Sequence, residues 1–309
     1  MRRLSLLVFL AAGLAAAEPP PAPKPAEPSS DEVYELGKSL FDQYAPAEIK
    51  EQYEFPSRER WDEFAARLQH ALDSDNLAEL AAYEPEARAA LEALHALPGY
   101  EDYADWLAAR LDYIEAAKQA TRLPPPPPPK PGQLASAIPY YDLWLQRVRA
   151  RPAPARADEL MPILRAAFAA EGVPAEVAWL AEVESSLDPA ARSPSGAKGL
   201  FQLMPITARS LGLSTLLPDE RANAEKSAHA AARYLQTLHA KFGEWPLAFA
   251  AYNAGEGRVR RILAARDGHK FADIAAALPS ETRMYVPKVC ATIAVRTGVT
   301  PEKLGPPRS

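Results

Sequence analysis

The sequence predicts a mainly α-helical protein. Its 309 residues include 62 alanines, and alanine favours a helix interior more than any other residue. The chain also has 32 prolines against 14 glycines, and proline ends helices, so the composition is that of helices with frequent stops. No Asn-Gly hairpin turn occurs in the sequence. Hydrophobic residues make up 48% of the chain, enough for a buried core, and the length suits about two domains.

Charge and cysteine content exclude several functional classes. The net charge is −5, whereas a nucleic-acid-binding domain normally carries a basic surplus, so we expect no nucleic acid partner. The single cysteine, Cys290, cannot form an internal disulfide or a cysteine-based metal site. We expect no metal and no cofactor.

The first residues have the pattern of a secretory signal peptide. Arg2 and Arg3 precede an apolar run over residues 4–17, and Ala15 and Ala17 give the small-x-small pattern of a cleavage site. An uncleaved membrane anchor is the alternative, but the run is shorter than the about 20 residues that span a bilayer. We expect cleavage after Ala17 and export to the periplasm or cell envelope.

Thirteen prolines lie in two tracts that divide the rest of the chain. Residues 18–30 and 121–136 are predicted to be stiff Pro-rich spacers. Between them, residues 31–120 are predicted to form a small helical accessory domain, because apolar residues recur there every three or four positions. These stripes are Trp61, Phe64, Leu68 and Leu72, then Tyr103, Leu107, Leu111 and Ile114.

Residues 137–300 are predicted to form a second, mostly helical domain, followed by a tail at 301–309. Its expected helices are 140–150, 158–170, 174–187, 205–211, 222–242, 246–252, 257–265 and 280–295.

The helix over 174–187 contains the first candidate catalytic residue, Glu184. Four apolar residues lie within about 60° of it on a helical wheel: Val177, Leu180, Ala181 and Leu187. Glu182 lies on the opposite face, where we expect it to meet water. A carboxyl held among apolar groups has a raised pKa and can serve as a general acid. A buried structural glutamate, satisfied by hydrogen bonds or an arginine, is the alternative.

The loop after this helix is rich in small and polar residues. Gly196 and Gly199 allow a tight path in which backbone can approach a ligand, although an ordinary turn is the alternative. Ser193 and Gln202 offer neutral hydrogen-bonding groups. No Lys-Ser or Lys-Thr pair follows the glycines, so a phosphate-binding loop is not indicated.

Two later segments repeat the combination of apolar helix and polar side chains. Tyr252 and Asn253 stand at a predicted helix end, and Glu281 and Tyr285 share a helix face at a spacing of four residues. Such groups beside a buried acid suit neutral, ring-shaped, hydrogen-bonding ligands, and sugars fit that description.

Together these segments resemble the four motifs of the lytic transglycosylases. The motifs read ESSLDP at 184–189, SPSGAKGLFQLMP at 193–205, AYNAG at 251–255 and ETRMYVP at 281–287. The segment of about 157–297 is most similar to the membrane-bound lytic murein transglycosylase D branch of the soluble-lytic-transglycosylase superfamily. The sequence departs from the common pattern at Leu187, Asp188 and Phe201, which are changes in packing.

The resemblance implies a goose-lysozyme-like catalytic domain that cleaves peptidoglycan. Glu184 would be the sole catalytic acid and base, and Tyr285 would stand near it. The residues implied to contact the glycan strand are Ser193, Gln202, Met204, Tyr252, Asn253 and Glu281. Residues 31–120 would be a candidate surface for a cell-wall protein partner.

The implied reaction cleaves the β-1,4 bond between N-acetylmuramic acid and N-acetylglucosamine and leaves 1,6-anhydromuramic ends. Three alternatives stay open. Asp188, Asp219 or Glu281 could act as a second carboxylate, as in ordinary glycosidases. The protein could be a hydrolytic lysozyme or chitinase on the same fold, or a glycan-binding module without turnover.

Overall fold

The structure is a computed structural model that describes residues 58–95, 101–123, 138–193 and 195–308. Within these ranges every regular element is a helix, and β-structure is limited to two isolated bridges that Lys198 forms with Arg192 and Leu203. The predicted mainly α class is thus confirmed for the described residues. The predicted signal peptide at 1–17, the spacer at 18–30, residues 31–57 and most of the linker at 121–136 lie outside them.

The described residues of the predicted accessory segment, 58–95 and 101–120, form four helices. They are α3 (Arg58–Asp73), α4 (Leu77–Ala82), α5 (Glu84–His95) and α6 (Glu101–Ala120). Asn76 caps α4, because its side chain accepts the backbone N–H groups of Ala78 and Glu79. Pro85 stands in the first turn of α5, where a missing N–H costs nothing. The predicted apolar stripes are buried at Leu68, Leu72, Leu107, Leu111 and Ile114.

The second part, described over residues 138–193 and 195–308, contains nine further α-helices and several short 3₁₀ turns. They are α7 (Tyr141–Arg149), α8 (Ala157–Ala170), η2 (Ala175–Trp179), α9 (Leu180–Ser185), α10 (Pro205–Ser210), η3 (Glu220–Ala222), α11 (Ala224–Phe242), α12 (Trp245–Ala254), α13 (Glu256–Arg266), α14 (Phe271–Ile274), η4 (Ala275–Ala277), α15 (Ser280–Thr297) and η5 (Pro301–Lys303). The single helix predicted over 174–187 is wrong, because a 3₁₀ turn precedes α9. The other predicted helices agree within two residues at each end. Helix α14 was not predicted, since four residues are too short to show a helical period.

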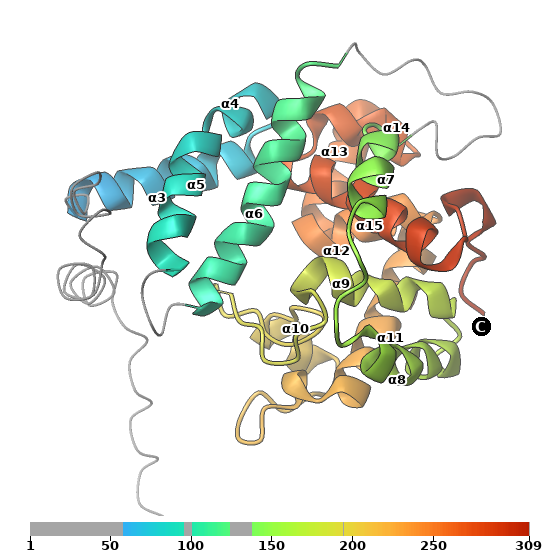
Figure 1. Ribbon diagram of the computed structural model, residues 1–309. Helices are drawn as coiled ribbons and strands as arrows, with labels where there is room; N and C mark the ends of the chain where they lie inside the picture. The colour runs from blue at the N-terminus through green and yellow to red at the C-terminus, as the bar shows by residue number, and fades with distance from the viewer. Residues whose placement is uncertain (1–57, 96–100, 124–137, 194, 309) are drawn as a thin grey trace, which may run out of the picture.

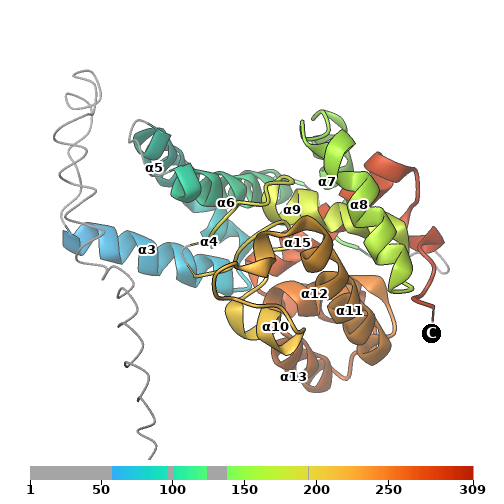
Figure 2. The ribbon, with the colours of Figure 1, turned by 90° about the horizontal axis from the view of Figure 1, so that it is seen from below.

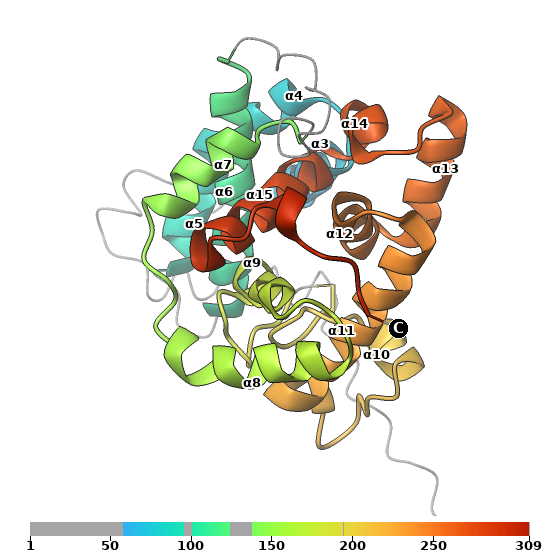
Figure 3. The same cartoon turned by 90° about the vertical axis from the view of Figure 1, so that its right-hand side faces the viewer.

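Helix α15 is the central element of the second part. It lies between α7 on one side and α12 on the other, as Figure 3 shows, and it also contacts η2 and α9. Most of its residues are buried, including Met284, Tyr285, Val286 and Val289. A helix whose residues are buried on most sides needs neighbours on most sides, which agrees with its central position.

The accessory helices pack against the second part through α3 and α6. They form one side of the molecule in Figures 1 and 2, and α3 and α6 both contact α15. The Tyr113 ring of α6 meets the buried Trp144 ring of α7 edge-on, with 5.9 Å between centroids. The backbone N–H of Ser280, at the start of α15, donates to the carbonyl of Ser74 at 2.6 Å. The buried apolar residues of both segments belong to one continuous cluster.

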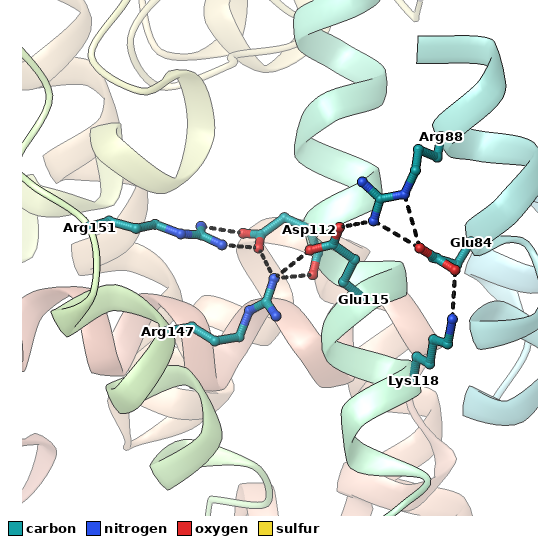
Figure 4. A network of polar contacts seen from close by, with 7 residues as sticks. All are labelled: Glu84, Arg88, Asp112, Glu115, Lys118, Arg147 and Arg151. Atoms are coloured by element: carbon teal, nitrogen blue, oxygen red, sulfur yellow. Dashed lines mark hydrogen bonds and ion pairs between the residues drawn. The ribbon is translucent and has the colours of Figure 1, made fainter. Parts of the chain in front are cut away.

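A network of charged side chains also joins α6 to its neighbours (Figure 4). Asp112 of α6 accepts hydrogen bonds from Arg147 at 2.6 Å and from Arg151 at 2.5 and 2.9 Å. It also pairs with Lys288 of α15 at 2.8 Å. Although burial raises the pKa of this carboxyl, the three cations hold it well below its usual range. The division into a 31–120 and a 137–300 domain stays a prediction, but the two segments share this network and one core.

Candidate active site

Glu184 lies near the end of α9, in a segment that is buried among apolar side chains. All four apolar residues that the helical wheel placed around it are 0% exposed: Val177, Leu180, Ala181 and Leu187. Ser186 and Leu187 adopt left-handed backbone conformations, with φ of 52° and 61°, and so end the helix directly after the acid. The Glu184 side chain keeps an intermediate exposure. It therefore sits in an apolar surrounding without being sealed from solvent.

The expectation that Glu182 meets water is wrong. Its side chain is only 15% exposed and accepts hydrogen bonds from Arg296 of α15 at 2.7 and 2.8 Å. A helical wheel shows which residues share a face, but it cannot show that a second helix covers the polar face. The two glutamates of α9 therefore differ in their partners: Glu182 has an arginine, and Glu184 has none bonded to it among the described residues.

Tyr285 of α15 is the hydrogen-bond partner of Glu184. Its hydroxyl donates a short bond to Glu184 Oε1. Burial raises the pKa of Glu184 to about 7, which outweighs the Tyr285 bond and the Arg110 charge that both lower it. Burial and the Glu184 charge in turn raise the pKa of Tyr285, so this hydroxyl stays a donor. Glu184 can thus carry a proton near neutrality and can also be stabilised once it has lost that proton.

Several other polar groups surround the acid. Glu281 lies one turn before Tyr285 on α15, and its charge raises the pKa of Glu184, whereas the charge of Lys288 lowers it. Burial followed by the Glu184 charge raises the pKa of Tyr252 on α12 well above its usual range. Burial raises the pKa of Tyr113 on α6, with the Glu281 and Glu184 charges adding to the effect. The acid site is thus built from four helices, α6, α9, α12 and α15.

The loop after α9 is fastened to the acid site by two adjacent carbonyls. The carbonyl of Leu200 accepts from Ser185 Oγ at 3.0 Å, and that of Phe201 accepts from the Tyr252 hydroxyl at 2.6 Å. The Phe201 ring is fully buried and stacks on Phe168, with 5.5 Å between centroids. The loop is therefore held against α9 and α12 by these two hydrogen bonds and by packing beneath.

A buried arginine holds the same loop from its other side. Arg221 is 7% exposed and donates to the carbonyls of Gly196 at 2.8 Å and Leu203 at 3.0 Å. Its other N–H groups bind Asp219 at 2.9 and 3.1 Å, and Lys198 binds the same carboxylate at 3.2 Å. Burial raises the pKa of Asp219, but these bonds outweigh it and bring the pKa to about 2.

The predicted glycan contacts of the loop are placed as follows. Ser193 Oγ accepts the backbone N–H of Ala197 at 2.9 Å, so this hydroxyl shapes the turn. The Gln202 amide donates to the carbonyls of Ala191 at 3.2 Å and Gly199 at 2.9 Å. Met204 is 42% exposed where α10 begins. The structure therefore gives Ser193 and Gln202 roles within the loop, while the Met204 side chain faces outward.

The remaining predicted residues lie on α12 and α15. Asn253 Oδ1 accepts from Thr282 Oγ1 at 2.7 Å, which joins the end of α12 to the start of α15. Glu281 Oε1 accepts from Arg110 of α6 at 3.3 Å. The structure brings Glu184, Tyr285, Tyr252 and Glu281 together at one site. Asn253 supports that site from one residue beyond Tyr252.

All three carboxylates considered as a second catalytic group are paired with an arginine. Asp188 accepts from Arg156 at 2.7 Å and from the backbone N–H of Ala190 at 3.2 Å. Asp219 is bound by Arg221 and Lys198, as described above. Glu281 is the one of the three whose charge acts on Glu184.

Arg110, Tyr113 and Lys288 were not predicted as parts of the site. The first two lie on α6, in the accessory segment, where the sequence shows only an apolar stripe. Nothing in the order of residues indicates that this stripe packs beside a helix from the other end of the chain. Lys288 stands three residues after Tyr285, so the i, i+3 spacing was a usable signal.

The described residues contain no cluster of three or more His, Cys, Asp or Glu side chains suited to a metal ion. Among them, no helix has the length and apolar character needed to cross a membrane.

Comparison with known proteins adds independent evidence. Residues 161–274 match the family model described as Transglycosylase SLT domain. Membrane-bound lytic murein transglycosylase D of Escherichia coli (strain K12) is 38% identical over 140 residues, which cover 44% of this chain and 31% of that protein. Soluble lytic murein transglycosylase of Salmonella typhimurium is 39% identical over 120 residues, covering 36% of this chain and 19% of that protein. The matches thus span less than a third of these two relatives.

Among solved structures, the 70-kDa soluble lytic transglycosylase of Escherichia coli aligns with a TM-score of 0.42 and 22% identity, covering 89% of this chain and 47% of that chain. The SLT match includes Glu184, the following loop and Tyr252, three of the features from which the site is built. Residues 161–274 of this chain therefore match the model of the same family that the sequence motifs resemble.

Proposed function

We propose that this protein is a lytic transglycosylase that cleaves the glycan strands of peptidoglycan. The observation that carries the proposal is the Glu184–Tyr285 pair: a carboxyl with a pKa of about 7, in an apolar surrounding, bonded to a tyrosine hydroxyl. The similarity to lytic murein transglycosylases over 140 and 120 residues supports the substrate class.

In the proposed reaction, Glu184 first acts as a general acid. It donates its proton to the oxygen of the β-1,4 bond between N-acetylmuramic acid and N-acetylglucosamine, and the bond from the muramic C1 to that oxygen breaks. An oxocarbenium-like centre forms at C1. The ionised Glu184, stabilised by the Tyr285 hydroxyl, then takes the proton of the muramic 6-hydroxyl. The 6-oxygen bonds to C1, which closes the 1,6-anhydro ring and returns the proton to Glu184 without consuming water.

The proposed reaction uses Glu184 both as acid and as base, and the other three candidate carboxylates are each paired with an arginine. Asp188 and Asp219 are each bonded to an arginine, so the charge of each already has a cationic partner away from Glu184. Glu281 is also paired, with Arg110 at 3.3 Å. A hydrolytic lysozyme or chitinase on this scaffold remains the alternative, with water in place of the 6-hydroxyl.

The E184Q variant tests the proposed acid. The glutamine side chain keeps the size and can still accept from Tyr285, but it cannot donate the proton, so digestion of isolated sacculi should fall by about 10²–10⁴-fold. E176Q is the matched control: Glu176 lies on η2, eight residues earlier, where its side chain has no hydrogen bond or ion pair among the described residues. It should digest sacculi as the unsubstituted protein does. Undiminished digestion by E184Q would contradict the assignment of Glu184.

Product mass separates the alternatives. Mass spectrometry of the released glycans should find anhydromuramic ends, which are one water lighter than reducing ends. Reducing ends would instead identify a hydrolase. Glycan binding by the unsubstituted protein without release of products would identify a binding module.

We further propose export of the protein to the periplasm or cell envelope, with cleavage after Ala17. The mature N-terminus, read by sequencing of protein from a cell-envelope fraction, should be Glu18. A cell-wall protein partner bound through residues 31–120 stays a prediction.

A further inference from the structure

Helix α6 lies outside the matched SLT segment, yet one of its faces borders the acid site. Trp106, Arg110 and Tyr113 follow one another at spacings of four and three residues and so share that face. The Arg110 guanidinium lies over the Trp106 ring, 4.8 Å from its centroid, and donates to Glu281 Oε1 at 3.3 Å. Stacking on an indole restricts the guanidinium, so the ring fixes where the positive charge stands.

The Arg110–Glu281 pair is only partly open to solvent. The two side chains are 25% and 21% exposed, which limits the screening of their charges by water. Arg110 reaches Glu281 through one carboxylate oxygen, Oε1, while Oε2 has no hydrogen-bond partner among the described residues. The pair therefore orients Glu281 and still leaves one of its oxygens available at the edge of the site.

We propose that Arg110 is a positioning residue for the reaction: α6 brings its guanidinium to Glu281, holds that carboxylate beside Glu184, and balances the negative charge at the acid site. The inference deepens the proposed function, since it concerns the group that would transfer the proton. It means that the acid site is complete only when the accessory helices are packed on α15.

The two members of the pair act on Glu184 in opposite directions. A positive charge favours the ionised carboxyl, which the ring-closing step uses, and a negative charge favours the protonated carboxyl, which bond cleavage uses. The other groups that face Glu184 are Tyr285 and Lys288 of α15, Tyr252 of α12 and Tyr113 of α6. The tyrosines stay neutral, and Lys288 is paired with Asp112 at 2.8 Å. Replacing Arg110 should therefore raise the pKa of Glu184, and replacing Glu281 should lower it.

The test is a titration of Glu184 without substrate. The full chain is labelled with ¹³C at the glutamate side-chain carboxyls and titrated by NMR, and E184Q identifies the Glu184 signal. In R110Q the midpoint should rise, because the cation is lost and Glu281 is left uncompensated. In E281Q it should fall. We expect each shift to be about half a pH unit or more, below the one to three units given by a charge in direct contact. R110K keeps the charge and should lie between R110Q and the unsubstituted protein.

R88Q is the matched control for loss of an arginine from the accessory helices. Arg88 of α5 pairs with Glu84 and Glu115 and is not among the groups that act on Glu184 (Figure 4). The Glu184 titration midpoint in R88Q should equal that of the unsubstituted protein. Equal midpoints in R110Q and E281Q, or shifts of both in one direction, would overturn the inference, as would an R88Q shift as large as that of R110Q. Should R110Q fail to fold by circular dichroism, the downward shift of E281Q and the intermediate value of R110K carry the test.

Wall digestion keeps the two proposals distinguishable. If the unsubstituted protein released no glycan from sacculi, the proposed function would fail, and the titration would still report on Arg110. If digestion were normal and the midpoints did not move, only the role of Arg110 would be wrong.

Discussion

At the scale of single residues, two glutamates on the short helix α9 differ in the partner that each is bonded to. Glu182 is neutralised by Arg296 at 2.7 Å, while Glu184 has a tyrosine hydroxyl as its partner. An arginine beside Glu184 would keep it ionised at neutral pH and remove the acid function. Burial raises the pKa of Glu184 from 4.5 to about 7, and the hydrogen bond from the neutral Tyr285 hydroxyl lowers it too little to offset this rise. Such a group has a stability cost, because the folded protein must hold a desolvated charge above that pH.

E184Q should therefore be more stable than the unsubstituted protein at alkaline pH. The folded-state pKa of Glu184 is raised from 4.5 to about 7, so the folded protein binds this proton more tightly than the unfolded chain does. The resulting stabilisation is fully present below pH 4.5 and is lost as pH rises through about 7. Glutamine carries no such dependence. At pH 8 we expect E184Q to gain about 2–3 kcal/mol in its free energy of unfolding relative to the unsubstituted protein, and close to none at pH 4.5.

Urea unfolding of both proteins at the two pH values measures this difference. E176Q serves again as the control and should show no pH-dependent gain. A gain for E184Q that is the same at both pH values would mean that Glu184 is not desolvated in the folded protein.

At the scale of elements, the loop between α9 and α10 depends on one close approach of two backbones. Gly199 has φ of 80°, and a Cβ atom built there would lie 2.0 Å from the carbonyl oxygen of Arg221. The sequence suggested that a glycine here lets backbone approach a ligand. In the structure Gly199 approaches the backbone of the residue whose side chain holds Gly196 and Leu203. The glycine therefore serves the loop itself.

Comparison of G199A with G196A should isolate that approach. Both glycines have positive φ, at 80° and 85°, so alanine strains the backbone at either position. A Cβ at Gly196 meets nothing within 4 Å, whereas at Gly199 it meets the Arg221 backbone. We expect G199A to be destabilised by about 1–3 kcal/mol more than G196A, the usual cost of overpacking. Thermal unfolding of the two variants measures the difference, and equal losses would show that the loop moves aside freely.

At the scale of the whole molecule, Asp112 joins three helices that are far apart in the chain. It lies on α6, its hydrogen-bonding arginines lie on and just after α7, and Lys288 lies on α15. The side chains of Asp112, Arg147 and Lys288 are only 11–12% exposed. Removal of one partner from such a group leaves uncompensated charge in a poorly hydrated place, which costs more than the net value of the intact network.

D112N should consequently destabilise the protein by about 3 kcal/mol at pH 7. The folded-state pKa of Asp112 is depressed, so its contribution is present above the ordinary carboxyl pKa of 3.8 and declines as pH falls below that value. Urea unfolding at pH 7 checks the loss, with D75N as the matched control, since the exposed Asp75 side chain has no hydrogen bond or ion pair among the described residues. A D112N loss no larger than that of D75N would contradict the structural role of the network.

The fold was predictable wherever the evidence is local. Alanine content, proline positions and apolar stripes predicted the helices of the second part, and a four-residue helix such as α14 escaped because it holds about one turn. The helix over 174–187 was misjudged since 3₁₀ and α turns place apolar residues at similar spacings. Glu184 and Tyr285 were predictable because their motifs and wheel positions mark them, whereas Ser193 and Gln202 carry hydrogen bonds inside the loop that no pattern reveals.

The sequence by itself determined that this chain is helical, that Glu184 is surrounded by apolar side chains, and that residues 161–274 match the SLT family model. These depend on periodicity, composition and motifs, which are properties of neighbours along the chain. Only the tertiary structure decided that Arg296 neutralises Glu182, that Tyr285 bonds to Glu184, and that α6 brings Arg110 to Glu281. Those pairings depend on how helices pack, and a pKa is set by the charges and the water left around a group after packing, whatever their distance in sequence.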